Sequence, residues 1–319
     1  MDSLPVSIII PNYNGEQILA ANLTSVTEAA RRYPGAVEII VVDDASGDNS
    51  VPMIAEQFPE IRVVTHDVNK GFAEAVHSGV TSSRHPIIIL LNSDVRPERQ
   101  FIAPLIRWFG RPDTFAVSPL ICDPRGKPQR VSWNIGKIIR GEIRNQNWEL
   151  DQSLSLVRGG TPLRSLYASG GSAAIRKEMF LQLGGFLSIY KPFYYEDRDL
   201  GTRAWQHGWQ TYFEPQSMVN HDHLGTINRF FATRKIKIIQ KRNRLYYLWL
   251  HLSTRKLFFS HIPWIFFRLL TRLLKMDLIY IAALSRALLR LGEIVRLRRE
   301  FAGQGDIKAL EKIIEDIAS

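Results

Sequence analysis

Short apolar segments alternate with helical segments through the first hundred residues, and this alternation constrains the fold more than any other feature. Nearly continuous apolar runs of about five residues are typical of strands that are buried on both faces. The segments between the runs, at 18–32, 52–58 and 71–82, have helical patterns. We therefore predict an α/β fold, with a mostly parallel sheet and helices on both of its faces. The predicted strands are residues 6–10, 38–42, 61–65 and 87–91.

Polar side chains follow three of these predicted strands. In parallel sheets of this kind, ligands bind beyond the carboxyl ends of the strands. We therefore expect the polar groups to converge at one edge of the sheet and to form a binding site there. They are Asn12 and Asn14 after the first strand, Asp43 and Asp44 after the second, and Asp94 after the fourth.

Two acidic motifs at this edge each allow two interpretations. In Asn92-Ser93-Asp94 the carboxylate could hold a divalent cation that also binds phosphates, or it could belong to an ordinary turn after a strand. Asp43 and Asp44, followed by Ser46 and Asp48, could bind a ribose or a base, or this cluster could cap the helix that follows. Each motif, taken alone, leaves both interpretations open.

Acidic and imidazole groups gather again further along the chain. Glu196-Asp197 follows an aromatic run at 193–195, and a carboxylate there could act as a general base with a shifted pKa. The same two acids would also suit the N-terminus of a helix. His221 and His223 could complete a metal site, or they could be structural.

Taken together and in this order, the motifs resemble glycosyltransferase family 2 and, more narrowly, its rhamnosyltransferase-like branch, whose members build bacterial surface polysaccharides. The resemblance covers about residues 4–228. It implies the GT-A fold, which is Rossmann-like. The matching segments are VSIIIPNYN at 6–14, EIIVVDDAS at 38–46, NKGFA at 69–73, IIILLNSD at 87–94, GGS at 170–172 and YEDRDL at 195–200.

The resemblance implies a role for each matching residue. Asp94 would bind Mn²⁺ or Mg²⁺, and His221 or His223 would complete that metal site. Asp197, within the Glu196-Asp197 motif, would be the catalytic base. A nucleoside diphosphate sugar would be bound by the remaining matching residues, which are Pro11, Asn12, Tyr13, Asn14, Asp43, Asp44, Asn69, Gly71, Asn92, Ser93 and Gly171.

The implied reaction is an inverting sugar transfer to a glycan or polyprenyl-linked acceptor, with dTDP-rhamnose or a UDP-sugar as the donor. A divalent cation would offset the charge that builds on the leaving diphosphate, and one base would take the proton of the acceptor hydroxyl. Asn92 replaces the first Asp of the family's Asp-x-Asp motif, so one carboxylate remains there. Inverting displacement requires no covalent nucleophile, which agrees with a single base.

Positive charge is concentrated in one segment of the chain. Residues 1–233 carry a net charge of −1, residues 234–299 a net charge of +14, and the last twenty residues a net charge of −3. In the basic segment large apolar residues separate the cations, and Arg268, Arg272 and Lys275 follow helical spacing. This cationic amphipathic pattern is typical of helices that lie in a membrane interface.

We therefore expect residues 234–299 to contact the cytoplasmic face of the cell membrane peripherally, near lipid-linked acceptors. The alternative is a helical subdomain that packs its apolar side onto the body of the protein. No stretch of 18 residues there is free of charge, so we expect no spanning helix. No nucleic-acid module accompanies the charge, and we expect no nucleic-acid partner.

The chain is predicted to divide into a GT-A domain at 1–233 and a helical basic region at 234–319. Residues 120–165 lose periodicity and are predicted to form a long loop or lid, with Trp133 and Trp148 helping to shape the acceptor site.

Cys122 is the only cysteine, which excludes an intrachain disulfide and favours a reducing compartment. The N-terminus carries an acid where a secretory signal would carry positive charge, so we interpret it as mature protein.

Two other functions are weighed against this one. A nucleotidyltransferase would place a glycine-rich basic loop after the first strand, and residues 11–16 are neither glycine-rich nor basic. A non-catalytic, membrane-associated module that binds a sugar nucleotide or a glycan would be expected to lose at least one of Asp94, Asp197 and His221. The sequence retains all three, and we predict an active, metal-dependent glycosyltransferase.

Overall fold

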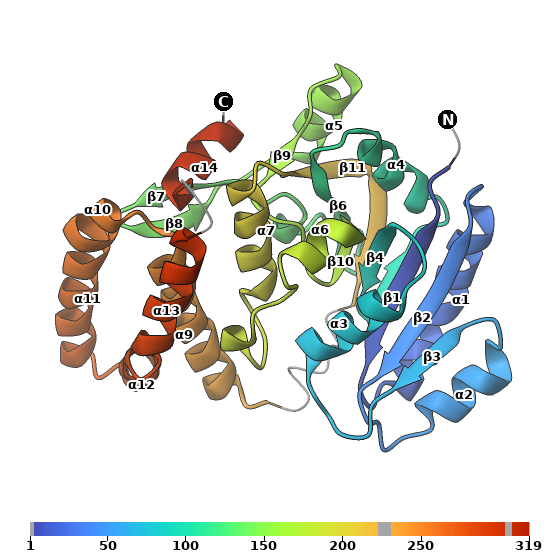
Figure 1. The fold of residues 1–319 in the computed structure, drawn as a ribbon, viewed down its shortest axis with the longest axis horizontal. Coiled ribbons are helices and arrows are strands. Elements are labelled where there is room, and N and C mark those ends of the chain that lie inside the picture. Colours follow the sequence, from blue (N-terminus) through green and yellow to red (C-terminus); the bar gives the residue numbers. More distant parts are fainter. Residues whose placement is uncertain (1–2, 223–230, 304–307, 319) are drawn as a thin grey trace.

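A nine-stranded sheet forms the centre of the protein in this computed structural model, which describes residues 3–222, 231–303 and 308–318 (Figure 1). The strand order is β3-β2-β1-β4-β10-β6-β11-β5, and β9 pairs with β11. β1 runs parallel to β2 and β4, whereas β10 lies antiparallel between β4 and β6. The predicted α/β fold is confirmed. The strands are β1 (Val6–Asn12), β2 (Val37–Asp43), β3 (Arg62–Thr65), β4 (Ile87–Leu91), β5 (Val95–Pro97), β6 (Thr114–Cys122), β9 (Arg164–Ser165), β10 (Ser172–Arg176) and β11 (Gln210–His221).

Helices cover both faces of the sheet because alternate residues of each strand point to opposite sides. Ile8 packs in one core cluster with Leu19 of α1, whereas Ile9 packs in another with residues of α3. Gly79 allows α3 to approach closely, since a Cβ at this position would lie 2.4 Å from a methyl group of Ile9. The helices of this part are α1 (Glu16–Arg32), α2 (Ser50–Gln57), α3 (Phe72–Ser82), α4 (Ile102–Ile106), α6 (Lys177–Gln182), α7 (Glu196–Gln206) and the 3₁₀ helices η1 (Arg107–Gly110) and η3 (Ser188–Tyr190).

Residues 120–165 contain regular structure, so the prediction of a long loop is wrong. After η2 (Arg130–Ser132), the strands β7 (Gly136–Ile139) and β8 (Glu142–Asn145) form an antiparallel hairpin, and α5 (Leu150–Arg158) follows. Arg140 and Gly141, with φ of 53° and 68°, make the two-residue turn that suits the twist of such a hairpin. The two strands have four residues each, which is too short to give a clear alternation in the sequence.

Two tryptophans anchor this region to the sheet. Trp133 stacks on Phe213 of β11 with ring centroids 5.8 Å apart, and Trp148 lies 5.3 Å from the same ring. The indole N–H of Trp133 donates to the carbonyl oxygen of Arg164 at 2.8 Å. These contacts give the two rings an anchoring role, and their place at the acceptor site stays a prediction.

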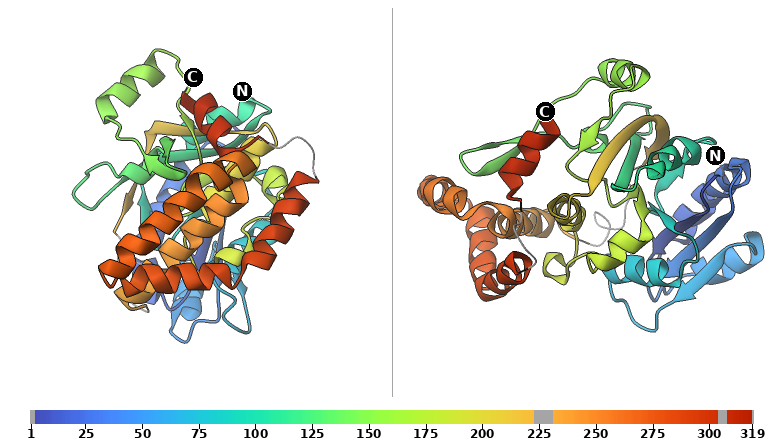
Figure 2. Two further views of the ribbon diagram at one scale, coloured as in Figure 1. Left: turned by 90° about the vertical axis from the view of Figure 1, so that its left-hand side faces the viewer. Right: turned by 45° about the horizontal axis from the view of Figure 1, so that its top comes forward.

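The basic region folds into helices on the side of the molecule far from β3 (Figures 1 and 2). Tyr247 and Leu248 of α9 are fully buried in a hydrophobic cluster that also contains Tyr190 and Trp205 of the body. One hydrophobic core therefore contains residues from both sides of the predicted boundary at 233. α9 packs on the body, as expected for a helical subdomain of this kind. The helices are α9 (Thr233–His251), α10 (Thr254–Lys256), η4 (Leu257–His261, a π-helical turn), α11 (Ile262–Leu274), α12 (Leu278–Leu288), α13 (Leu291–Ala302) and α14 (Leu310–Ala318).

The outer helices of this region expose large apolar side chains. Of the sixteen that are exposed in the described part of the chain, thirteen lie between residues 258 and 295. Phe259 is 83% exposed and Leu274 is 79% exposed. The continuous helix at 254–274 is long and apolar enough to cross a membrane by length and composition alone. This finding departs from the expectation of no spanning helix, which rested on charges such as Arg268 and Arg272 within it.

Candidate active site

Asp94 and His221 meet at the edge of the sheet where β4 and β11 end. The strand β5 follows Asp94 and pairs antiparallel with β11, so that Val95 lies opposite His221. This pairing brings His221 Nε2 to 3.3 Å from Asp94 Oδ2, and Asp94 is buried. The structure thus brings two of the predicted metal ligands together. His223 lies outside the described residues.

These groups fit a divalent cation. A carboxylate beside an imidazole suits Mn²⁺, which accepts oxygen and nitrogen ligands. Asp222 adds a buried carboxylate oxygen that has no hydrogen-bond partner among the described residues, and its backbone N–H donates to the carbonyl of Asp94 at 3.3 Å. No group of three or more acidic, His or Cys side chains in the described ranges is already gathered as a metal site. The arrangement therefore suits a cation that a diphosphate also holds. Asp222 was not predicted as a metal ligand from the sequence. Its position directly after His221 is the one signal that could have indicated this role.

Asn92 packs against the turn formed by Gly170 and Gly171. Its backbone N–H donates to the carbonyl of Gly171 at 2.9 Å, and a Cβ on Gly171 would lie 2.9 Å from Asn92 Nδ2. The carbonyl of Ser93 accepts a hydrogen bond from the side-chain amide of Asn22 at 2.8 Å. The turn that carries Asp94 is therefore held from two sides.

Polar residues after β1 and β2 form one hydrogen-bond network. Asn12 Nδ2 donates to Asp43 Oδ1 at 2.9 Å, and the Ser46 hydroxyl donates to the same oxygen at 2.6 Å. Asn14, with φ of 50°, accepts the N–H of Gly47 at 2.7 Å through its side-chain oxygen. The network joins the two strand ends into one surface. Pro11, within β1, and Tyr13, just after this strand, are partly exposed.

Asp44 holds the loop that leads into α3. Its carboxylate accepts the backbone N–H of Lys70 at 2.8 Å and that of Gly71 at 2.7 Å, and His66 Nδ1 lies 2.7 Å from Oδ1. Gly71 has a φ of 88°, a conformation that favours glycine. Asn69 Nδ2 donates to the backbone carbonyl of Asp44 at 3.3 Å. Asp44 thus fixes the loop that carries two predicted donor-binding residues.

The capping interpretation of this acidic cluster holds for Asp48 but not for Asp43 or Asp44. Asp48 Oδ1 accepts the N–H of Ser50, at the start of α2, at 3.1 Å. Asp43 and Asp44 are buried, and their carboxylates accept hydrogen bonds from other loops. Their contact with a nucleoside stays a prediction.

Asp197 lies in the first turn of α7, beside the same glycine turn. Its Oδ2 accepts the N–H of Gly170 at 3.2 Å, and its Oδ1 accepts the N–H of Arg198 at 2.7 Å. Since Gly171 contacts Asn92, one short turn joins the residues around Asp197 to those around Asp94. The predicted base and the predicted metal ligand therefore sit on two sides of one rigid feature.

Burial raises the pKa of both carboxyl groups in the Glu196-Asp197 motif. Desolvation and the charge of Asp197 raise the pKa of Glu196 to about 8. Desolvation also raises the pKa of Asp197, but the N–H of Gly170 and the guanidinium of Arg198 oppose this shift. Asp197 therefore ionises first, and its charge keeps Glu196 protonated at neutral pH. Glu196 Oε2 is buried without a hydrogen-bond partner in the described part of the chain.

The loop that leads into α7 is strained and is held by a distant helix. Tyr194 and Tyr195 have left-handed backbones, with φ of 74° and 78°, a conformation that costs about 1 kcal/mol or more at each non-glycine residue. The buried Asn243 of α9 places its Nδ2 at 2.9 Å from the carbonyl oxygen of Phe193 and 2.8 Å from that of Tyr194. The sequence analysis missed Asn243, because a helical pattern does not signal which loop an amide will contact.

Arg198 is a third residue, after Asp222 and Asn243, that was not predicted from the sequence. Its guanidinium lies 4.8 Å from the ring centre of Tyr167 and 5.1 Å from that of Tyr195, and it donates to the Tyr167 hydroxyl at 2.8 Å. Desolvation opposes its charge, but the neighbouring tyrosines raise its pKa above the usual value. A permanent cation therefore follows Asp197 directly, which is a signal that the sequence does carry.

The sheet and the two groups of residues that meet at Gly170-Gly171 define a glycosyltransferase fold of the GT-A type. Residues 7–184, more than half of the chain, match the family described as Glycosyl transferase family 2. The chain belongs to glycosyl transferase family 2. The resemblance seen in the sequence motifs is thereby confirmed, and the match favours this family over a nucleotidyltransferase.

The chain is similar to glycosyltransferases that are named for different sugars. N-acetylgalactosaminyltransferase 6 of Drosophila melanogaster is 27% identical over 249 residues, covering 74% of this chain and 36% of that protein. N-acetylglucosaminyl-diphospho-decaprenol L-rhamnosyltransferase of Mycobacterium tuberculosis is 27% identical over 244 residues, covering 69% of this chain and 76% of that protein. The chain thus spans about a third of the first relative and about three quarters of the second.

A solved structure supports the fold assignment. The crystal structure of GalNAc-T7 with UDP, GalNAc and Mn²⁺ superposes with a TM-score of 0.61 at 19% identity. The superposition covers 79% of this chain and 49% of that chain. At this level of identity the likeness shows the GT-A fold and leaves the substrate to be argued from the site.

Proposed function

We propose that this chain is an inverting, metal-dependent glycosyltransferase that moves a sugar from a nucleoside diphosphate sugar to a hydroxyl of a glycan or lipid-linked acceptor. The observation that carries the proposal is the Gly170-Gly171 turn, which contacts Asp197 on one side and Asn92 on the other. Because the Gly170-Gly171 turn fixes both the base and the metal-binding turn, the base can act on the acceptor hydroxyl while the metal acts on the leaving diphosphate of the same reaction.

Asp197 takes the proton of the acceptor hydroxyl in this proposal, as that oxygen attacks the anomeric carbon of the donor. Burial raises the pKa of Asp197, which strengthens it as a base, while Gly170 and Arg198 favour its ionised form. Glu196 stays protonated and keeps a second negative charge away from the base. A single attack without a covalent intermediate inverts the configuration at the anomeric carbon.

The residues that would stabilise the leaving diphosphate lie on the other side of the Gly170-Gly171 turn. Asp94 and His221, with Asp222 beside them, would hold Mn²⁺ or Mg²⁺. When bound, the cation offsets the negative charge that develops on the leaving diphosphate. Most of the proposed donor-binding residues lie at or just after the ends of β1, β2 and β4, at the same edge of the sheet as Asp94. Asp43 and Asp44 already accept several hydrogen bonds from the chain, so they shape the loops around the nucleoside.

The donor is proposed to be dTDP-rhamnose or a UDP-sugar. The rhamnosyltransferase relative supports the first choice, and the UDP in the similar crystal structure supports the second. We place the reaction in bacterial surface polysaccharide synthesis, because the rhamnosyltransferase relative, 76% of which is covered by the match, is named for a decaprenol-linked acceptor.

Peripheral membrane contact through residues 234–299 is part of the proposal. The net charge of +14 in this segment and the apolar side chains exposed between 258 and 295 support it. Each basic residue near an anionic surface contributes on the order of 1 kcal/mol of attraction. The enzyme would then work at the cytoplasmic face of the membrane, where lipid-linked acceptors are presented.

Thermal unfolding with UDP, dTDP and GDP, each with and without Mn²⁺, tests the donor site, because a ligand that binds only the folded protein raises the midpoint. We expect one nucleotide to raise it in the presence of Mn²⁺. Release of that nucleotide from its sugar conjugate should be lost in Asp197→Asn, whereas the rise in midpoint remains. A parent protein that binds the nucleotide but shows no turnover would support the non-catalytic binding module instead.

A further inference from the structure

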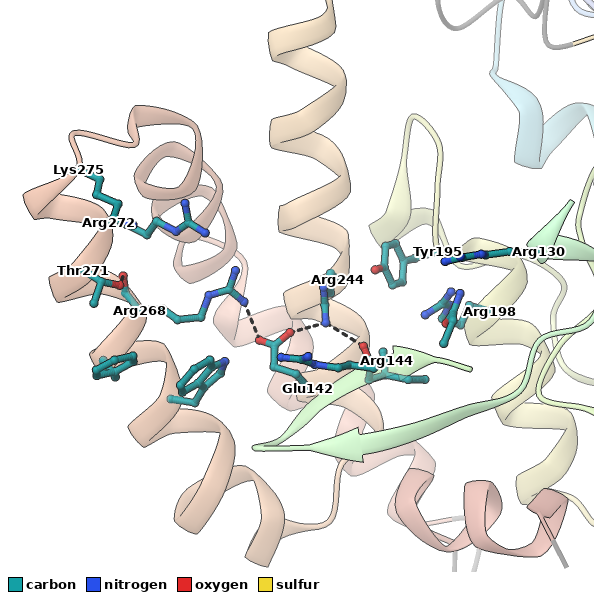
Figure 3. Close-up of a pocket in the computed structure, with 14 residues that line it drawn as sticks. Arg130, Glu142, Arg144, Tyr195, Arg198, Arg244, Arg268, Thr271, Arg272 and Lys275 are labelled. Carbon is teal, nitrogen blue, oxygen red and sulfur yellow. Dashed lines mark hydrogen bonds and ion pairs between the residues drawn. The ribbon is translucent and has the colours of Figure 1, made fainter. Parts of the chain in front are cut away.

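A cavity of about 740 Å³ lies between the body and the basic region (Figure 3). Its walls come from β8, the start of α7, α9 and α11. Fourteen residues line it, of which seven are Arg or Lys and one is Glu. None of them comes from the carboxyl ends of β1, β2 or β4, so the cavity is separate from the proposed donor site.

The cavity holds more positive charge than the protein itself neutralises. Figure 3 shows Arg244 of α9 and Arg268 of α11 converging on Glu142 of β8; Arg268 Nη1 lies 3.2 Å from the carboxylate. Arg272 pairs with Asp277 at 3.1 Å, outside the cavity lining. Among the residues that the structure describes, the other four cations make no ion pair with a carboxylate. They are Arg130, Arg144, Arg198 and Lys275.

These four cations repel one another, because no carboxylate in the described part of the chain pairs with them. An anionic ligand would offset this repulsion, so the cavity favours such a ligand. The fork of an arginine guanidinium matches the oxygens of a phosphate and can form two hydrogen bonds to it. Three of the four unpaired cations are arginines. The chemistry of the cavity therefore points to a phosphate or diphosphate group.

The cavity borders the motif that carries the proposed base. Tyr195 and Arg198 line it and flank the Glu196-Asp197 motif in the sequence, whereas Asp197 itself is not among the lining residues. The Tyr167 hydroxyl and two tyrosine rings hold the Arg198 guanidinium in place. A sugar attached to a phosphate bound there would extend from Arg198 toward Asp197.

The same helix that closes the cavity presents an apolar surface on its other side. Arg268 and Arg272 of α11 line the cavity (Figure 3), whereas Phe266 is 67% exposed and Leu270 is 61% exposed. Figure 2 shows α11 as an outer helix, with α9 between it and α7. A ligand with a phosphate and a long hydrocarbon chain would contact both sides of this helix.

We propose that this cavity binds the phosphate or diphosphate group of a lipid-linked acceptor, whose hydrocarbon chain lies against the exposed apolar side of α11. The proposal rests on the function proposed above and specifies its acceptor class. Arg268, Arg272 and Lys275, which follow helical spacing in the sequence, would then contact the phosphate in the cavity as well as lie near the membrane.

Binding of farnesyl diphosphate, measured by calorimetry with the full chain, tests this proposal. Farnesol and inorganic pyrophosphate serve as probes that carry only the lipid or only the phosphates. Arg144→Gln combined with Lys275→Gln removes two exposed cavity cations. Arg32→Gln combined with Arg84→Gln is the matched control, since both side chains are exposed and lie outside the cavity.

We expect farnesyl diphosphate to bind more tightly than either probe, and the cavity variant to bind it roughly ten-fold or more weakly. The control variant should bind like the parent, and all three proteins should unfold at similar temperatures. No binding by the folded parent, or equal weakening in the control, would overturn the proposal. Pyrophosphate binding as tight as that of farnesyl diphosphate would overturn the lipid-linked assignment.

Asp94→Ala separates this inference from the donor site. If the diphosphate occupies the cavity, this substitution leaves farnesyl diphosphate binding unchanged. Loss of binding in Asp94→Ala, with retention in the cavity variant, would place the diphosphate at the donor site and overturn the inference. A parent that binds farnesyl diphosphate through the cavity but binds no nucleotide would overturn the proposed function and leave the cavity assignment standing.

Discussion

The side-chain amide nitrogen of Asn243 lies 2.8 Å from the backbone carbonyl oxygen of Tyr194, just before the Glu196-Asp197 motif. The same nitrogen lies 2.7 Å from the carbonyl oxygen of Tyr190. A helix of the basic region thus holds both ends of the loop that positions the proposed base. Asn243 is a positioning residue, because it acts on Asp197 through this loop.

Asn243→Leu should slow turnover while leaving the donor site intact. The substitution keeps the side-chain size but leaves buried carbonyls without donors, at a cost of about 1–3 kcal/mol, and it releases the strained tyrosines. We expect kcat to fall by roughly ten-fold or more, with the nucleotide-induced rise in unfolding midpoint unchanged. Tyr246→Phe is the control, since its hydroxyl contacts the carbonyl of Arg286 at 3.3 Å, on the C-terminal helices. Equal losses in both variants would argue against a positioning role.

Glu196→Gln should change how stability depends on pH. The pKa of Glu196 rises from an ordinary value of 4.5 to about 8 on folding, so the folded protein keeps a proton that the unfolded chain releases. The free energy of unfolding of the parent therefore falls as pH rises between these values. The neutral amide cannot titrate, and we expect the variant to become progressively more stable than the parent across this window. Thermal unfolding of both proteins at several pH values measures the difference; two parallel curves would refute the expectation.

The same substitution should leave turnover near neutral pH close to that of the parent, since a protonated carboxylic acid and an amide have the same shape and no net charge. Above about pH 8 the parent acquires a second negative charge beside Asp197, and the variant does not. A pH profile of turnover for both proteins measures this difference. A large loss of activity at pH 7 would show that Glu196 has a role beyond staying neutral.

Asp94→Asn should remove the effect of Mn²⁺ on nucleotide binding. The substitution keeps the shape of the side chain but removes the carboxylate that lies beside His221. We expect the Mn²⁺-dependent rise in unfolding midpoint with a nucleoside diphosphate to be lost, and EDTA to have the same effect on the parent. Asp151→Asn, on the exposed side of α5, is the control. A rise that survives in Asp94→Asn would move the metal away from this residue.

Phe259→Ser combined with Leu274→Ser should weaken membrane contact without disturbing the fold. Both side chains are mostly exposed, so their removal changes little of the packed core. Less apolar surface then remains to enter a bilayer, and we expect several-fold less protein to float with anionic vesicles. Leu181→Ser, on a helix of the body, should float like the parent. Unchanged flotation of the double variant would show that this surface does not meet the membrane.

The sheet and its binding edge could be predicted from the sequence because both depend on local patterns. Continuous apolar runs mark buried strands, and the polar residues after them must meet at the edge where parallel strands end. The turn at Arg140-Gly141 was harder to recognise, because the flanking strands of four residues carry no clear alternation. The packing of Trp133 and Trp148 on Phe213 could not be predicted, because an aromatic residue in an irregular segment can face a ligand or a core equally well.

Relationships across long separations in the sequence could not be predicted. Nothing in the segment around Asn243 shows that its amide faces the loop at Tyr194. The left-handed tyrosines, likewise, depend on contacts from another helix. The cavity is formed by segments that begin near residue 130 and end near residue 275, so its charge surplus became visible only when the fold brought them together.

The packing of α9 on α7 determines how this protein can be divided. The Tyr247 hydroxyl lies 2.8 Å from the Thr202 hydroxyl, and His251 Nε2 lies 2.8 Å from Asp199 Oδ1, all in buried positions. A chain cut after residue 233 would leave these groups of α7 facing water. A variant with less exposed apolar surface is therefore better made by substitutions on the outer helices than by removing all residues after 233.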